Sequence, residues 1–189
     1  MTLSVVGISG SVTRPSRTTA LVTAVLEAIG QRLAVRSTLV ELIDAAPLLF
    51  RSLTPATLDP AASDLLHTIG SADLLVLGTP VYRASYTGAL KHLFDLLPAD
   101  ALIGTPTILL ATAGSPLHGL VLEHQLRPLL SFFGALIVPT ALYATHADFQ
   151  DHVLACPALE ERIARAVDAS VRLLPGTGAN AMARALAEI

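Results

Sequence analysis

The hydrophobic positions of this chain follow two patterns that alternate along the sequence, short apolar runs and longer helical repeats. The runs at 3–8, 72–80 and 107–112 show no alternation, which is typical of strands buried on both faces of a parallel sheet. Residues 35–42 instead alternate apolar and polar side chains with period two, which predicts an edge strand. The apolar stretch 136–143 predicts a fifth strand.

Apolar residues with helical spacing separate these predicted strands. The first helix is indicated by the apolar face that runs from Leu21 to Ile29. Residues 44–60 hold three prolines, Pro47, Pro55 and Pro60, and predict an irregular connection. Further helices are predicted at 61–70, 89–97, 119–133 and 158–174.

The order of these elements predicts an α/β fold. Parallel strands joined by helices through right-handed crossovers form a doubly wound, flavodoxin-like sheet of five parallel strands in the order 2-1-3-4-5. A chain of 189 residues is long enough for one such domain and short for two. We expect this domain to span residues 1–174, and Pro175-Gly176-Thr177-Gly178 begins a C-terminal tail at 175–189.

A loop rich in glycine, hydroxyl and arginine residues joins the first predicted strand to the first helix. It offers backbone N–H groups, hydroxyls and the guanidinium groups of Arg14 and Arg17, and the positive end of the helix dipole points the same way. The loop lacks the dinucleotide and P-loop glycine patterns and has no cysteine nucleophile, which favours a bound monophosphate. The alternative is that Ser16 or Thr18 only caps the helix and both arginines are solvated.

Two further loops, at 78–88 and 113–119, follow the third and fourth predicted strands. In open α/β sheets ligands bind at the carboxyl ends of the strands, so the three loops should converge on one ligand. Their sequences resemble the NAD(P)H-dependent FMN reductase family. The resemblance is carried by Gly10-Ser11 to Ser16-Arg17-Thr18, Thr79-Pro80-Val81-Tyr82 and Ser85-Tyr86-Thr87-Gly88-Ala89-Leu90-Lys91, and it covers about residues 3–174.

Within that family the chain is most similar to reductases that supply reduced FMN to bacterial alkanesulfonate monooxygenases. The resemblance implies hydride transfer from NADPH or NADH to FMN, delivery of the reduced flavin to a flavin-dependent monooxygenase, and a role in sulfonate sulfur assimilation. It names no catalytic side chain and no metal, since the protein has only to hold two flat rings in register. The sequence does not separate NADH from NADPH, because no motif for the 2′-phosphate is visible.

The resemblance also implies the residues that bind the flavin. The phosphate would be held by Ser9, Ser11, Arg14, Ser16, Arg17 and Thr18. The isoalloxazine ring would lie along Thr79, Pro80, Val81, Tyr82 and Ser85, with Thr112, Ala113, Gly114 and Ser115 on its other side. Backbone N–H groups of 79–82 and 113–115 would stabilise the charge that gathers on the reduced flavin.

The predicted helix at 119–133 is apolar around most of its circumference. One side can face the sheet, and another needs a second protein surface, which predicts a homo-oligomer, a dimer or a tetramer. Pro128 should bend this helix or sit beside a bulge. In the resembled reductases the helix carries a one-residue insertion at a tetramer interface, usually a tyrosine, and His124 aligns with that position; a partly exposed interface histidine is the alternative. Exposed apolar positions such as Leu122 should lie in the interface.

Composition limits the possible partners and compartments. Hydrophobic residues make up 52% of the chain, yet no apolar run reaches the roughly 20 residues that span a bilayer, so no membrane partner is expected. The N-terminus lacks a signal-peptide pattern, which favours the cytoplasm. A net charge of -3 and the absence of a basic run argue against nucleic acid. The single cysteine, Cys156, precedes a helix and is interpreted as structural, and Lys91 and Asp95 as a surface ion pair.

Two other functions remain open. A flavodoxin-type electron carrier usually has a strongly acidic surface for steering toward its partners, and the weak net charge of this chain argues against that role. An FMN-containing quinone or azo-dye reductase would keep the flavin bound and reduce a second substrate in the same pocket. Flavin affinity and pocket access distinguish this enzyme from a flavin-supplying reductase, and motifs report neither.

Overall fold

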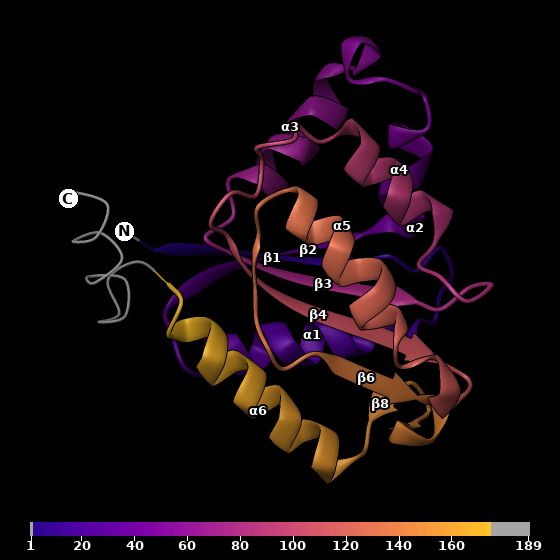
Figure 1. The fold of residues 1–189 in the computed structure, drawn as a ribbon, viewed down its shortest axis with the longest axis vertical. Coiled ribbons are helices and arrows are strands. Elements are labelled where there is room, and N and C mark those ends of the chain that lie inside the picture. The colour runs from indigo at the N-terminus through magenta and orange to yellow at the C-terminus, as the bar shows by residue number, and fades with distance from the viewer. Residues whose placement is uncertain (1, 175–189) are drawn as a thin grey trace.

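The computed structural model describes residues 2–174, so the predicted tail at 175–189 lies outside the described residues. Its main sheet is parallel and has the order β2-β1-β3-β4-β5, which confirms the predicted flavodoxin-like topology (Figure 1). A further strand, β6, also pairs with β4. The strands are β1 (Leu3–Ser9), β2 (Val35–Glu41), β3 (Leu74–Pro80), β4 (Pro106–Ala113), β5 (Leu136–Ile137) and β6 (Leu142–Thr145).

Helices cover both faces of the sheet, and each face has its own apolar core (Figure 1). Helices α1 and α6 pack on one face, and α2 to α5 pack on the other. The helices are α1 (Arg17–Gly30), α2 (Leu42–Leu49), α3 (Pro60–Gly70), α4 (Gly88–Leu96), α5 (Arg127–Phe132) and α6 (Pro157–Val171). A separate two-stranded hairpin, β7 (Phe149–Gln150) and β8 (Val153–Leu154), precedes α6.

The two central strands explain the unbroken apolar runs in the sequence. Every residue of β4 and all but the last of β3 are buried, because helices cover both of their faces. β2 lies at the sheet edge, as its alternating pattern predicted, and most of its residues are partly or fully exposed. In the described residues no helix is both long and apolar enough to cross a bilayer.

The prediction of an irregular connection at 44–60 is wrong for its first part, because α2 occupies residues 42–49. Leu42, Ala45 and Leu49 are buried and lie on one helical face, so their packing outweighs the hydrogen bond that Pro47 cannot donate. The spacing of these three residues was the available signal. After α2 the chain is irregular apart from one short 3-10 turn, Pro55–Thr57, until Pro60 opens α3.

The stretch predicted as one strand at 136–143 forms two short strands. β5 pairs with the start of β4 and β6 with its end, and four residues between them face only two residues of β4. Pro139 lies in this bulge, where a missing N–H breaks no ladder bond. The bulge lets the edge strand continue to the carboxyl edge of the sheet, where β6 ends beside Ala113.

The segment predicted as a helix bent near Pro128 contains a π-helical turn, Leu122–Leu126, directly before α5. The Arg127 N–H donates to the Leu122 carbonyl, five residues back, which accommodates one additional residue. His124 lies within this turn and is exposed. Leu122 is only 4% exposed and packs in the core, so the expectation that it lies on an exposed surface is wrong.

Two minor predictions concern residues away from the sheet edge. Lys91 and Asp95 form an ion pair on the exposed side of α4. Cys156 is partly buried at the N-cap position of α6 and packs against the α1–α6 core, which agrees with its structural interpretation.

Candidate functional site

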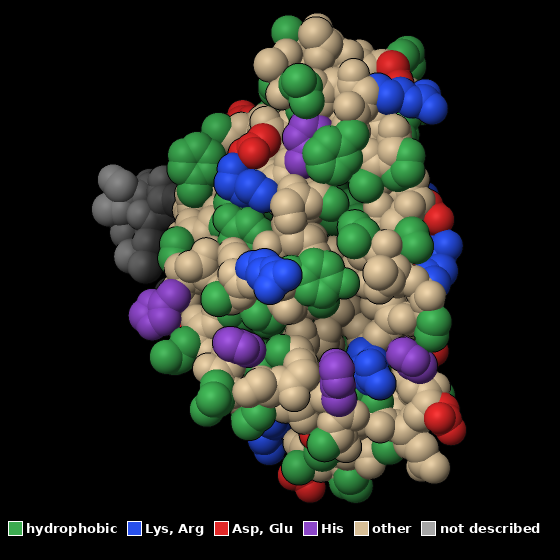
Figure 2. Space-filling view, turned by 90° about the vertical axis from the view of Figure 1, so that its right-hand side faces the viewer, with side chains coloured by type: hydrophobic (Ala, Val, Ile, Leu, Met, Phe, Trp, Pro, Cys, Tyr) green, Lys and Arg blue, Asp and Glu red, His purple; other side chains and the backbone are tan. Residues whose placement is uncertain are grey.

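The loops after β1, β3 and β4 converge on a pocket of about 150 Å³ at the carboxyl edge of the sheet, the side of the molecule that faces the viewer in Figure 2. This arrangement agrees with the rule that open α/β sheets bind ligands at that edge. The structure brings together these predicted residues in its lining: Ser11, Ser16, Arg17, Thr18, Pro80, Val81, Tyr82, Thr112, Ala113 and Gly114. The lining also includes Thr13, Pro15 and His146, which sequence reasoning missed.

Hydrogen bonds between loops hold the first loop against the other strands. The Gly10 N–H donates to the Gly78 carbonyl at 2.7 Å, and the Thr87 hydroxyl donates to the Gly10 carbonyl at 2.8 Å. Thr87 also caps α4, since its oxygen accepts from the Leu90 N–H. The turn after β1 and the start of α4 therefore form one hydrogen-bonded unit. This unit fixes the loop after β1 in place as a wall of the pocket.

The N-terminus of α1 forms the floor of the pocket. Ser16 is the N-cap, and its hydroxyl oxygen accepts from the Thr19 N–H at 3.2 Å, as the capping alternative predicted. That cap leaves the N–H groups of Arg17 and Thr18 without an intrahelical acceptor. These two donors and the positive end of the helix dipole favour an anion in front of them.

Arg17 is the cation available to such an anion. Its Nε is buried, and the guanidinium makes no hydrogen bond or ion pair within residues 2–174. A buried donor without a partner is costly, and a ligand that accepts from it removes that cost. The second half of the capping alternative, that both arginines are solvated, does not hold for the buried Nε of Arg17.

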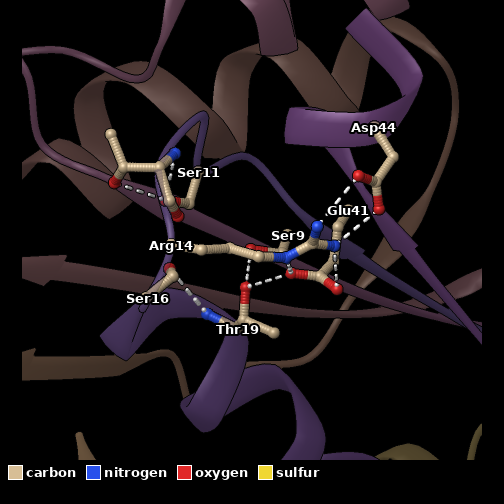
Figure 3. A network of polar contacts seen from close by, with 8 residues as sticks. Ser9, Ser11, Arg14, Ser16, Thr19, Glu41 and Asp44 are labelled. Atoms are coloured by element: carbon tan, nitrogen blue, oxygen red, sulfur yellow. Dashed lines mark hydrogen bonds and ion pairs between the residues drawn. The ribbon is translucent and has the colours of Figure 1, made fainter.

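Arg14 is directed elsewhere and does not line the pocket. Figure 3 shows its guanidinium between two carboxylates, Glu41 at the end of β2 and Asp44 in α2. Nη2 lies 2.7 Å from Glu41 Oε2, and Nη1 lies 2.9 Å from Asp44 Oδ1. The hydrogen bonds from Arg14 lower the pKa of the Asp44 carboxyl. Of the two arginines, only Arg17 has a guanidinium without a partner among residues 2–174.

Two of the predicted hydroxyl residues, Ser9 and Thr79, support the pocket from behind. Ser9 and Thr79 are fully buried; the Ser9 hydroxyl lies 2.8 Å from that of Thr19, and Thr79 Oγ1 accepts from the Thr87 N–H. The Thr18 hydroxyl lies 2.6 Å from that of Thr112 and so joins α1 to β4. Ser9 and Thr79 therefore position the loops and do not line the pocket.

The loop after β3 makes a tight turn at the mouth of the pocket. Tyr82 and Ser85 exchange two backbone hydrogen bonds, and Arg83 and Ala84 between them have φ angles of 51° and 66°. Two positive φ angles in succession give a type I′ turn, which carries strain in residues other than glycine. The turn leaves the Tyr82 side chain 43% exposed.

Backbone N–H groups in the loops after β3 and β4 were predicted to stabilise charge on the flavin. The two loops differ in whether these N–H groups are already hydrogen-bonded within the protein. The Val81 N–H donates to the Thr112 carbonyl at 2.8 Å, and the Tyr82 N–H donates to the Ser85 carbonyl, so both are already used and that expectation is wrong for them. In the described residues the N–H groups of Gly114 and Ser115 have no acceptor. Gly114 and Ser115 are thus the remaining donors on this side of the site.

The loop after β4 is supported by Tyr143, which lies in β6, and by His146, which follows that strand. The Tyr143 hydroxyl donates to the Ser115 carbonyl, and burial raises the pKa of Tyr143, which keeps that hydroxyl protonated. The His146 ring faces Gly114, where an added Cβ would lie 3.4 Å from the ring. His146 follows β6, and since that strand is displaced by the bulge, no sequence spacing indicated its position.

Two larger hollows lie away from this edge. One of about 620 Å³ lies between α1 and α6, and one of about 500 Å³ lies between α3 and the end of α4. Neither combines helix N-terminal donors with a guanidinium that lacks a partner, so size alone does not identify the site. In the described part of the chain no three histidine, cysteine or acidic side chains are grouped for a metal.

Comparisons with known proteins confirm the family that the sequence resembles. The sequence model of a family described as NADPH-dependent FMN reductase matches residues 3–150. An FMN reductase (NADPH) of Pseudomonas aeruginosa is 47% identical, with 91% of this chain and 92% of the relative covered. The NADH-dependent FMN reductase SfnE of Pseudomonas putida is 46% identical, with coverages of 90% and 92%. The apo crystal structure of the NADH:FMN oxidoreductase EMOB superposes with a TM-score of 0.82 at 32% identity, over 93% of this chain and 91% of that one. The chain belongs to the NADPH-dependent FMN reductase family.

Proposed function

We propose that this reductase reduces FMN with NADPH or NADH and supplies the reduced flavin to a flavin-dependent monooxygenase in sulfonate sulfur assimilation. The observation that carries the flavin part is the Arg17 guanidinium, which is partly buried beside the free N–H groups of α1 and has no partner in the described part of the chain. The monooxygenase and sulfonate parts rest on the sequence similarity to reductases that serve alkanesulfonate monooxygenases.

The residues of the pocket fit a flavin phosphate. The Arg17 side chain and the N–H groups of Arg17 and Thr18 donate to its oxygens, and the Ser11 and Ser16 hydroxyls line the same small pocket. A volume of about 150 Å³ accommodates the phosphate and not the ring system, so the ring lies on the open surface that Tyr82 and Gly114 border. These roles are proposals for each residue named.

The bound flavin supplies the hydride acceptor. The chain's own residues supply position: Tyr82 and the type I′ turn border one side of the ring surface, and Gly114 the other. The free N–H groups of Gly114 and Ser115 offer hydrogen bonds to negative charge on that side. Because hydride transfer between two rings needs register more than proton transfer, we assign no catalytic acid or base.

The shallow ring surface favours a flavin that binds and leaves over a permanently held group. A small ligand is held tightly when most of its surface is buried, and a single chain offers only a small enclosed pocket here. This geometry supports the flavin-supplying reductase over the quinone or azo-dye reductase. We further propose that the protein works in the cytoplasm, where NAD(P)H is available.

Gel-filtered protein tests this function directly. We expect NADPH or NADH oxidation to depend saturably on added FMN and to be negligible without it. A quinone and an azo dye, each offered with a trace of FMN, should not replace free FMN. Rapid reduction of the quinone at trace FMN would instead favour an enzyme with a bound flavin, and coupled turnover of a sulfonate monooxygenase tests the downstream role.

We also propose that the chain forms a homo-oligomer through the segment around the π-helical turn. Leu117, Leu120 and Phe132 are 86%, 64% and 71% exposed, which leaves large apolar side chains in water. The segment also touches the site, since the Ser85 hydroxyl donates to Gln125 Oε1 at 3.2 Å. Assembly and flavin exchange can therefore influence each other.

Charged substitutions should separate the subunits. We expect Leu120→Glu or Phe132→Glu to shift the sedimentation coefficient from an oligomer to a monomer, because burying an unpaired carboxylate at an interface is unfavourable. Leu53→Glu is the matched control, since Leu53 is 77% exposed and lies in the connection between α2 and α3. His124→Ala should change the rate of flavin exchange more than the assembly. A wild-type chain that sediments as a fully active monomer would contradict this proposal.

A further inference from the structure

We infer that Glu41 and Asp44 make the phosphate loop selective for FMN, which ends in one phosphate, over FAD, in which an adenylate extends that phosphate. The inference deepens the proposed function and rests on it, because it concerns which flavin the same site accepts. Both carboxylates lie outside the pocket that holds the predicted phosphate ligands. They act on the groups beyond the first phosphate.

The charge outside the phosphate loop is negative despite the presence of an arginine. Figure 3 shows Arg14 with all three guanidinium nitrogens directed at Glu41 and Asp44. Nε and Nη2 contact Glu41 at 3.3 and 2.7 Å, and Nη1 and Nη2 contact Asp44 at 2.9 and 2.5 Å. One guanidinium thus meets two carboxylates, and the three groups together carry one negative charge.

Glu41 is held firmly in this arrangement. Its Oε1 also accepts from the Thr19 hydroxyl at 3.2 Å, and Thr19 lies 2.8 Å from the Ser9 hydroxyl (Figure 3). Thr19 belongs to the first turn of α1, so the carboxylate is tied to the helix whose N-terminus faces the phosphate pocket. Glu41 is 19% exposed, so solvent screens its charge less than that of Asp44, which is 65% exposed.

A second hollow of about 560 Å³ adjoins the phosphate pocket, and the two share Pro15 and Ser16. Arg14, Glu41 and His152 belong to the walls of this second hollow. A group that extends from a phosphate bound in the first pocket across Pro15 and Ser16 therefore enters this second hollow. This hollow is wide open to solvent, so shape alone does not exclude FAD.

Charge supplies the discrimination that shape does not. The adenylate of FAD brings a second phosphate past Pro15 toward Glu41, which lines the second hollow, and toward Asp44, which shares the Arg14 guanidinium with it. Like charges several ångströms apart at a partly screened surface change an affinity by several-fold. FMN avoids this repulsion because its single phosphate ends at Arg17.

Equilibrium dialysis against FMN, FAD and riboflavin, without NAD(P)H, tests the inference by binding alone. We expect the wild-type chain to bind FMN at least about tenfold more tightly than FAD. Glu41→Gln and Asp44→Asn should each reduce that ratio about two- to fivefold, with the larger change for Glu41→Gln, and the double variant should reduce it further. Gln keeps an oxygen that can accept from the Thr19 hydroxyl.

Asp95→Asn is the matched control, because Asp95 also pairs with a cation at the surface but lies outside both hollows. It should leave the FMN to FAD ratio unchanged, and riboflavin should bind all variants equally. An unchanged ratio in the double variant would overturn the inference, as would parallel losses for all three flavins. A wild-type chain that binds no flavin contradicts the proposed function, whereas equal binding of FMN and FAD contradicts only this inference.

Discussion

Replacing Arg17 with alanine is expected to weaken FMN binding about 10- to 100-fold. This range corresponds to about 1.5–3 kcal/mol, the usual contribution of a hydrogen bond to a charged group. Arg17 is the guanidinium that lines the pocket, and its buried Nε has no partner in the described residues. The apo protein should lose no stability, since the substitution also removes an unsatisfied buried donor.

Riboflavin separates a phosphate contact from general damage to the site. Because riboflavin has no phosphate, its affinity should be almost the same for the wild type and for Arg17→Ala, as measured by equilibrium dialysis. Arg36→Ala is the charge-matched control: Arg36 is exposed on β2 and pairs in register with Ser4, near the opposite end of the sheet. Equal losses of FMN and riboflavin would show that Arg17 does not hold the phosphate.

Gly78→Ala is expected to destabilise the fold by about 1–3 kcal/mol, the usual effect of overpacking, and to lower Tm by about 3–10 °C. A Cβ at residue 78 would lie 2.1 Å from Leu110 Cδ1 and 2.6 Å from Val22 Cγ2. It would also lie 3.2 Å from Thr18 Cγ2. Since Thr18 is bonded to Thr112, the displacement should reach the start of α1 and weaken FMN binding as well.

Gly30→Ala provides the comparison for this experiment. A Cβ at Gly30, the last residue of α1, meets nothing within 4 Å, and alanine favours a helix. Thermal unfolding should therefore show an unchanged or slightly raised Tm for Gly30→Ala. A Tm for Gly78→Ala within about 1 °C of the wild type would mean that α1 moves away from β3 at little cost.

Much of the fold is readable from local patterns because burial leaves a periodic trace in the sequence. The runs at 72–80 and 107–112 predicted β3 and β4, since a strand covered on both faces can be apolar at every position. The loops after those strands could then be assigned to one edge by topology alone. Pro47 misled the same reasoning. The prediction gave one proline more weight than the apolar face that in fact stabilises α2.

The sequence by itself determined the sheet order, the edge at which the candidate site lies and most of the residues that line its pocket. Only the tertiary structure decided that Arg14 bonds to Glu41 and Asp44 while Arg17 has no partner in the described residues, and that His146 faces Gly114. Both arginines look alike in the sequence, three residues apart in one loop. The physical reason is that periodicity reports the environment of a segment, whereas the partner of a charged side chain depends on which distant residues the fold brings within hydrogen-bonding distance.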